Sequence, residues 1–255
     1  TIFMLPVTKV SYSSTLLPAL LIGIFACYCE KFLTKIIPGI LRTVLVGAGT
    51  MILTYIAGVV VLGPLGDLVG GIVVKFFLWA SATFGPVAIA LLASAMPWLV
   101  MTGMHHAVTP FMVQAFADPG YDVFFRPSYI LHNMAEGGAC LGVALRTKNP
   151  EFRAECLSLA FGCIVAGVTE PALYGVNLPL KRPMLGIMAG TAVGGIIAGV
   201  LGATAYVYGY STILALPIFQ QTMWAMAIAI VAAIVVSALV TAALGFEDRP
   251  VKAQK

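Results

Sequence analysis

Long apolar stretches, separated by short groups of charged residues, run through most of this chain. The ranges 43–66, 76–117 and 183–246 contain no Asp, Glu, Lys or Arg. A helix needs about 20 apolar residues to cross the hydrocarbon core of a bilayer. The pattern therefore predicts about five transmembrane helices. We expect them near residues 14–29, 43–65, 76–96, 184–208 and 220–246.

The composition supports a membrane protein. Of the 255 residues, 60% are hydrophobic and only 9% are charged, and the mean hydropathy is +1.01. Soluble domains carry roughly 25% charged residues. These values exclude a cytosolic enzyme, a nucleic-acid-binding protein and a disordered chain. The net charge of +4 is consequently interpreted as a guide to membrane orientation and not as a surface for nucleic acid.

Basic residues gather between the apolar stretches. Lys and Arg are enriched on the cytoplasmic side of bacterial membrane proteins, so we expect these groups to face the cytoplasm. Residues 1–42 are then a linking helix with a cytoplasmic segment, and residues 247–255 a cytoplasmic linker. The basic groups are Lys31/Lys35/Arg42, Arg146/Lys148/Arg153, Lys181/Arg182 and Arg249/Lys252/Lys255.

Two segments of the expected transport domain, residues 43–246, fit the spanning pattern poorly. Residues 154–181 have basic groups at both ends, and the apolar arms on either side of Glu170 and Pro171 are too short to cross. Proline disfavours a helical conformation at the residue before it. We therefore expect a re-entrant hairpin near 154–181, and a second near 127–146, where the chain is again too polar for a lipid-facing span.

Glycine and cysteine are expected to serve packing. Gly190, Gly194, Gly195 and Gly199 recur at a spacing that allows membrane helices to approach closely. The five cysteines show neither a disulfide framework nor the spacing of a zinc site, so we interpret them as small buried side chains. No metal site is predicted.

A few polar residues could carry chemistry. Glu170 is a carboxylate between apolar arms, which is costly in a membrane unless it faces protein or a water-filled cavity. The alternative is a structural carboxylate that binds backbone amides at the break. His105 and His106 could relay a proton or bind a hydroxyl, or could simply bond to backbone carbonyls. Asp122 is expected in a solvated loop.

The segment GVTEPALYGVNLPLKRP at residues 167–183 resembles a signature of the enzyme IIC family. These proteins are the sugar-translocating subunits of the bacterial phosphotransferase system, glucose superfamily, and the resemblance is strongest to the β-glucoside branch. Further agreement, in the same order along the chain, comes from YSST at 12–15 with EKFL at 30–33, GMHH at 103–106, and GACL at 138–141 leading to Lys148–Asn149.

The resemblance implies an all-α integral membrane protein with about five transmembrane helices plus two re-entrant hairpins, forming the C-terminal part of an enzyme IIC domain. It implies translocation of a sugar coupled to phosphorylation of its 6-hydroxyl by the phosphocysteine of a IIB domain. It also implies a homodimer in the bacterial cytoplasmic membrane, multi-pass, with a cytoplasmic C-terminus and no cofactor. The partners are then the sugar, the phosphorylated IIB domain and the lipid bilayer.

The same resemblance marks Glu170, His105 and Asn177. Weaker candidates, taken from the residues alone, are Arg126, His132, Asn133 and Glu136. Glu170 and His105 are the expected catalytic pair, binding the hydroxyl that is phosphorylated and accepting its proton. Glu136 stands where the family has glutamine. The alternative function is a proton-coupled secondary sugar transporter in which Glu170 and His105 relay the proton, and a third reading is a non-transporting membrane scaffold. The expected sugar-binding residues are Glu170, His105, His106, Asn177, Thr169 and Arg126.

Overall fold

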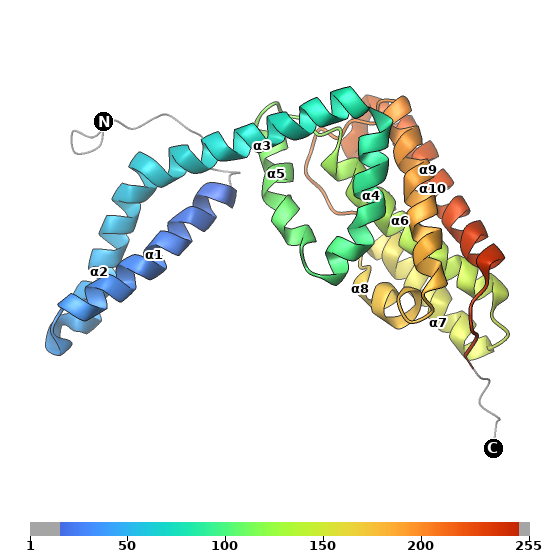
Figure 1. Ribbon diagram of the computed structural model, residues 1–255, viewed down its shortest axis with the longest axis horizontal. Helices are drawn as coiled ribbons and strands as arrows, with labels where there is room; N and C mark the ends of the chain where they lie inside the picture. Colours follow the sequence, from blue (N-terminus) through green and yellow to red (C-terminus); the bar gives the residue numbers. More distant parts are fainter. Residues whose placement is uncertain (1–15, 250–255) are drawn as a thin grey trace, which may run out of the picture. The chain divides into compact units, whose positions relative to one another are not determined.

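The structure is a computed structural model that describes residues 16–249; most of these residues lie in helices, and none of them lies in a β-strand. The parts of the expected N-terminal segment and C-terminal linker at 1–15 and 250–255 lie outside the described residues. The chain divides into two compact units (Figure 1). Unit 1 holds the residues up to Phe76 with Thr109–Pro119, and unit 2 holds Phe77–Val108 with the residues from Gly120 onward.

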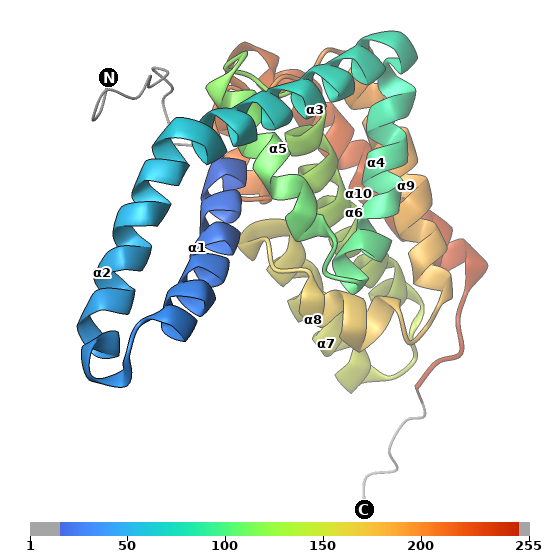
Figure 2. The ribbon, with the colours of Figure 1, turned by 60° about the vertical axis from the view of Figure 1, so that its left-hand side comes forward.

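Unit 1 is built on a helical pair. Helix α1 (Leu16–Ile36) and helix α2 (Gly39–Ala57) lie side by side, joined by a short turn at Pro38 (Figure 2). Helix α2 continues through a π-helical stretch, η2 (Gly58–Leu62), into α3 (Gly63–Phe84), whose second part belongs to unit 2. The second part of α5 (His105–Ala117) completes unit 1.

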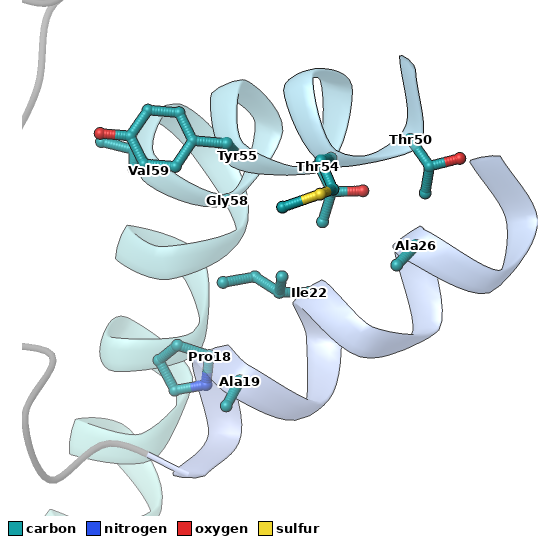
Figure 3. A pocket seen from close by; sticks show the side chains of 10 residues that line it. Pro18, Ala19, Ile22, Ala26, Thr50, Thr54, Tyr55, Gly58 and Val59 are labelled. Atoms are coloured by element: carbon teal, nitrogen blue, oxygen red, sulfur yellow. The ribbon is translucent and has the colours of Figure 1, made fainter. Parts of the chain in front are cut away.

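An apolar groove of about 480 Å³ lies between α1 and α2 (Figure 3). The only side-chain hydroxyls in its lining are those of two threonines and a tyrosine on α2. The Thr50 and Thr54 hydroxyls are buried without a hydrogen-bond partner. The groove is lined by Pro18, Ala19, Ile22, Ala26, Thr50, Met51, Thr54, Tyr55, Gly58 and Val59.

In unit 2, the other helices pack around one central helix. Helix α6 (Phe125–Arg146) packs against α4, α7, α9 and α10, and 19 of its 22 residues are buried. Helices α9 and α10 pack along each other on one side of it (Figures 1 and 2). The other bounds are α4 (Pro86–Met101), α7 (Pro150–Phe161), α9 (Arg182–Val200), the 3-10 helix η5 (Ile213–Thr222) and α10 (Met223–Leu244).

The glycines of α9 allow this close packing, as the sequence predicts. A Cβ atom on Gly190 would lie 2.5 Å from the carbonyl oxygen of Ala233 on α10. A Cβ on Gly195 would lie 2.5 Å from the Cα of Ala90 on α4. Helix α9 therefore uses glycine on two faces to approach two neighbours. Of the cysteines, Cys29, Cys140, Cys156 and Cys163 are buried as predicted, whereas Cys27 is exposed.

The spanning pattern is confirmed in part. Three described helical stretches are long and apolar enough to cross a membrane: Gly39–Gly66, Arg182–Val200 and Ile213–Leu244. The single span expected at 76–96 is wrong, because α3 ends at Phe84 and the chain turns at Gly85, whose φ is +53°. Glycine tolerates this backbone conformation, which side chains disfavour.

The second expected hairpin is also wrong. Residues 127–146 lie within the uninterrupted helix α6. Its polar residues avoid lipid because neighbouring helices cover them, so the helix has no need to break and return. Polarity indicated correctly that this segment is shielded from lipid, but it did not indicate the way in which it is shielded.

Candidate functional site

The segment 154–181 is a broken helix that turns back on itself. Helix α7 runs into a π-helical stretch, η3 (Gly162–Ala166), and the chain leaves the helix at Gly167 in a left-handed conformation, φ +76°. A single helical turn, α8 (Glu170–Ala172), then leads into a second π-helical stretch, η4 (Leu173–Asn177). Pro171 occupies the first turn of α8, where a missing amide hydrogen costs nothing.

The two arms of this hairpin lie side by side against α6. A Cβ on Gly175 of the returning arm would lie 3.8 Å from Leu159 Cδ1 of the entering arm. Both arms also contribute to one apolar cluster, so the hairpin is a packed element and not a free loop. The buried members are Cys140, Val143, Ala144, Phe152, Cys156, Ala160, Cys163, Ala172 and Val176.

Glu170 lies at the break, and it is exposed. Thr169, directly before it, is only 5% exposed and has no capping hydrogen bond from its side chain to α8. The arrangement presents a carboxylate at the point where two helical arms meet.

His105 lies close to this hairpin. It begins α5 after a turn containing Gly103, whose φ is +72°. The Tyr174 hydroxyl, on the returning arm, donates to the carbonyl oxygen of Met101 at 3.2 Å, which ties the hairpin to this turn. Glu170 is near enough to the His105 ring for an electrostatic interaction between them.

The surroundings of His105 hold its backbone, and the backbone of Leu99 forms a hydrogen bond with its ring. The Tyr129 hydroxyl on α6 donates to the His105 carbonyl oxygen at 2.6 Å. The His105 Nδ1 atom is buried without a hydrogen-bond partner, and the ring centroid lies 3.9 Å from that of His106. His106 itself is exposed. Glu170, His105 and His106 thus form one neighbourhood with two imidazoles and one carboxylate.

Asn177 and Arg126 are engaged elsewhere. Asn177 is fully buried, and its Oδ1 accepts from the Cys140 thiol at 3.7 Å. Arg126 is 2% exposed and donates to the Gly209 carbonyl oxygen and the Ser211 hydroxyl. Its guanidinium also lies 5.6 Å from the ring centroid of Tyr129 and the same distance from that of Tyr208. In this structure both side chains support the frame of the site.

Asn133 is a weaker candidate in the sequence, on a polar segment, and its contacts could not be predicted there. Its Nδ2 donates to the Gly167 carbonyl oxygen at 3.1 Å and to the Ser211 carbonyl oxygen at 2.8 Å. This amide therefore joins α6, the hairpin break and the loop after α9.

Asp122 corrects another expectation, because it is 1% exposed and not solvated. Its carboxylate accepts from the backbone amides of Phe124, Phe125 and Arg126 at 2.8, 2.9 and 2.5 Å. A carboxylate at a helix N-terminus satisfies amides that have no partner within the helix. Asp122 therefore anchors the start of α6, and its place just before that helix is the signal that could have revealed it.

A second titratable pair lies deeper on α6. His132 and Glu136 are 1% and 0% exposed, and their Nε2 and Oε1 atoms are 3.6 Å apart. That distance is too long for a hydrogen bond, and none of their ring nitrogens or carboxylate oxygens has a hydrogen-bond partner. The two residues lie near enough to His105 and Glu170, respectively, for electrostatic interaction. Two buried polar side chains, His132 and Glu136, therefore lie within electrostatic range of the site.

Comparison with known proteins places these features in a family. The family model described as "Phosphotransferase system, EIIC" matches residues 1–191. The arbutin-, cellobiose- and salicin-specific EIIBC component of Escherichia coli K12 is 32% identical over 98% of this chain and 52% of its own length. The β-glucoside-specific EIIBCA component of Bacillus subtilis 168 is 34% identical over 96% of this chain and 40% of its own length.

A more distant relative is the trehalose-specific EIIBC component of Escherichia coli K12, which is 30% identical over 93% of this chain and 51% of its own length. The chain spans about half the length, or less, of these curated relatives. No solved structure matches. The family model covers most of the chain, including the turn with His105 and the Glu170 hairpin, and the chain therefore belongs to the EIIC family of the phosphotransferase system, a family of multi-pass membrane permeases.

Proposed function

We propose that this chain translocates a sugar across the bacterial cytoplasmic membrane while the sugar is phosphorylated by a IIB domain. The family supports this role, and the relatives named for arbutin, cellobiose, salicin and other β-glucosides support a β-glucoside or related disaccharide as substrate. We place the C-terminus in the cytoplasm, where the basic groups at the chain's helix ends would lie. The homodimer implied by the family resemblance stays a prediction.

One observation carries the proposal: an exposed carboxylate at a helix break lies within electrostatic range of a histidine ring that has an unpartnered nitrogen. A sugar hydroxyl is a weak nucleophile at neutral pH. A carboxylate or imidazole that accepts its proton as the new bond forms assists the attack. Glu170 and His105 have the required chemistry and come from two different elements that Tyr174 ties together.

The proposed reaction is a phosphoryl transfer. The 6-hydroxyl oxygen of the sugar attacks the phosphorus of a phosphocysteine on the IIB domain, the O–P bond forms, and the S–P bond breaks with the thiolate as leaving group. The hydroxyl proton passes to Glu170 or His105. Most of the catalysis of such a transfer is positioning and charge stabilisation, which suits a site built on a rigid hairpin.

The remaining predicted site residues fall into two groups, those at the rim of the sugar site and those that support its frame. We assign His106 and Thr169 to the rim of the sugar site because they adjoin His105 and Glu170. Arg126 and Asn177 have buried partners, so we assign them to holding the frame and not to contacting the sugar. This assignment revises the expectation that both bind substrate directly.

The test is phosphotransfer from phosphorylated IIB to salicin or cellobiose, in membranes that carry the full-length protein. Glu170→Gln should abolish transfer while the protein stays folded and inserted, because the amide cannot accept a proton. His105→Ala should lose more activity than His106→Ala, which serves as the matched control. Near-normal transfer by Glu170→Gln would refute the role of the carboxylate.

An uptake assay distinguishes the proposed function from proton-coupled transport. Proteoliposomes without IIB should show no sugar uptake when a pH step is applied. Uptake driven by the pH step alone would instead favour a proton-coupled transporter in which Glu170 and His105 relay the proton. Failure to bind any sugar would favour a scaffold.

A further inference from the structure

A short strap follows the last helix of unit 2 and crosses the Glu170 hairpin. After α10 ends at Leu244, Gly245 adopts φ +67° and turns the chain. The Arg182 side chain donates to the Leu244 carbonyl oxygen at 2.7 Å and holds the start of this strap. Its last two described residues, Asp248 and Arg249, join it to the hairpin and to the connection between α6 and α7.

Arg249 touches both arms of the hairpin. Its Nη1 pairs with Glu155 Oε2 on the entering arm at 2.9 Å. Its Nη2 donates to the carbonyl oxygen of Gly175 on the returning arm at 2.6 Å. The guanidinium also lies 4.0 Å from the ring centroid of Phe152. One planar cation, with donors in a fixed fork, therefore bridges two segments about 20 residues apart.

Asp248 fixes the strap so that Arg249 is held in this position. Its carboxylate accepts from the Thr147 hydroxyl at 2.6 Å and from the Lys148 backbone amide at 2.7 Å, both in the connection between α6 and α7. It also accepts from the backbone amide of Arg249 at 2.9 Å. The strap is thereby anchored to the base of the entering arm before Arg249 reaches across to the returning arm.

The contact with Gly175 lies close to the reactive carboxylate. Gly175 is five residues after Glu170, in the last turn of the short stretch η4. Carbonyl groups in the last turn of a helix lack partners within that helix, so a side-chain donor can stabilise them. Residues 167–169 are not helical, so the entering arm does not fix the orientation of α8 through a continuous helix. A contact that holds the returning arm therefore also limits the orientation of α8 and of Glu170.

We propose that Arg249, held by Asp248, is a positioning residue for the reaction: it clasps the two arms of the hairpin and so sets the place of Glu170. This inference rests on the proposed function. Glu155 and Arg249 are about 43% and 42% exposed, so the clasp can be removed without opening the core.

The test compares Arg249→Met, which keeps an apolar stem against Phe152 but loses the charge and donors, with Arg249→Lys, which keeps the charge. Arg42→Met, at an exposed position on α2, is the matched control for loss of an arginine. Each full-length variant is examined in lipid nanodiscs by amide hydrogen exchange of residues 167–178, by salicin binding, and by phosphotransfer from phosphorylated IIB.

Arg249→Met should accelerate exchange in residues 167–178 and lower kcat by roughly fivefold, with salicin affinity changed by less than about twofold, as expected for a partly exposed ion pair with a second hydrogen bond. Arg249→Lys should recover part of kcat, and Arg42→Met should match wild type. Faster exchange with unchanged kcat would overturn the positioning role, and unchanged exchange would overturn the clasp itself.

Failure of the proposed function gives a different result. If the wild-type protein transfers no phosphoryl group to any sugar, the positioning role falls with the proposed function. Hydrogen exchange still decides in that case whether Arg249 holds the arms together.

Discussion

Helices α6 and α10 have the same length, 22 residues each, and opposite character. Helix α6 carries Arg126, His132 and Glu136 and is almost wholly buried, whereas α10 has no charged residue and only eight of its residues are buried. One face of α10 presents large apolar side chains to the outside. These are Trp224, Ile228, Val231, Val235 and Leu239.

The contrast shows how a membrane changes the rule for helix faces. In a soluble protein the apolar face of a helix turns inward, but in a bilayer the lipid accepts apolar side chains and excludes charged ones. The exposed residues of α10 recur every three or four positions, as expected for one lipid-facing stripe. The polar helix occupies the centre because the neighbouring helices shield its polar groups from lipid there. Some of these groups, such as the Asn133 amide, also find hydrogen-bond partners.

The largest predicted effect comes from placing a charge on the lipid-facing stripe of α10. Val231 is 60% exposed and lies near the middle of the helix. Val231→Lys should disfavour insertion by about 2.5–3.5 kcal/mol, whereas Val231→Leu should be neutral. A membrane-insertion assay on both variants checks this. If lysine inserts as well as leucine, the stripe does not face lipid and the contrast with α6 fails.

The next effect is at the contact between the two helices. A Cβ on Gly138 of α6 would lie 2.5 Å from the Ile234 carbonyl oxygen on α10. Gly138→Ala should therefore destabilise the protein by about 1–3 kcal/mol through overpacking. Gly47→Ala on α2 is the control, since nothing lies within 4 Å of its Cβ position. Thermal unfolding in detergent measures both, and equal melting temperatures would contradict the close α6–α10 contact.

A smaller effect is expected from removing the buried carboxyl of α6. Glu136 is 0% exposed and its oxygens have no hydrogen-bond partner. Glu136→Gln keeps the shape and removes the need to bury a charge, so stability should stay within about 1 kcal/mol of wild type or rise. Unfolding measurements decide this. A loss of several kcal/mol would show that the carboxyl has a partner that stabilises its charged form.

The smallest effect concerns the tie between the ends of the two helices at Asp248. Burial would raise the pKa of Asp248, but hydrogen bonds from Thr147, Lys148 and Arg249 hold that pKa below its ordinary value of 3.8. A carboxyl with a lowered folded pKa stabilises the protein at neutral pH and loses this contribution as the pH falls through that folded value.

Asp248→Asn should therefore lower the free energy of unfolding slightly at pH 7. The difference from wild type should shrink in acid, below the ordinary Asp pKa. Unfolding measured across that pH range would show the two curves converging, and a gap independent of pH would assign the effect to lost hydrogen bonds alone.

Much of the fold was accessible from local pattern. The apolar stretches predicted α10, α9 and the α2–η2 stretch, because length and hydropathy alone decide whether a segment can cross a bilayer. The break at Glu170 was predicted because Pro171 restricts the backbone before it. The turn at Gly85 was missed, since one glycine in an apolar run does not reveal a positive φ.

The sequence by itself therefore determined that the protein lies in a membrane, that it is helical, and that a helix breaks at Glu170, since each of these depends on neighbouring residues. Only the tertiary structure decided that residues 127–146 form one buried helix, that Arg126 and Asn177 have inner partners, and that Arg249 clasps the hairpin. Those features depend on contacts between residues far apart in the chain, such as Asn133 with Ser211 and Arg249 with Glu155. Partners at that separation are set by packing, which no local pattern encodes.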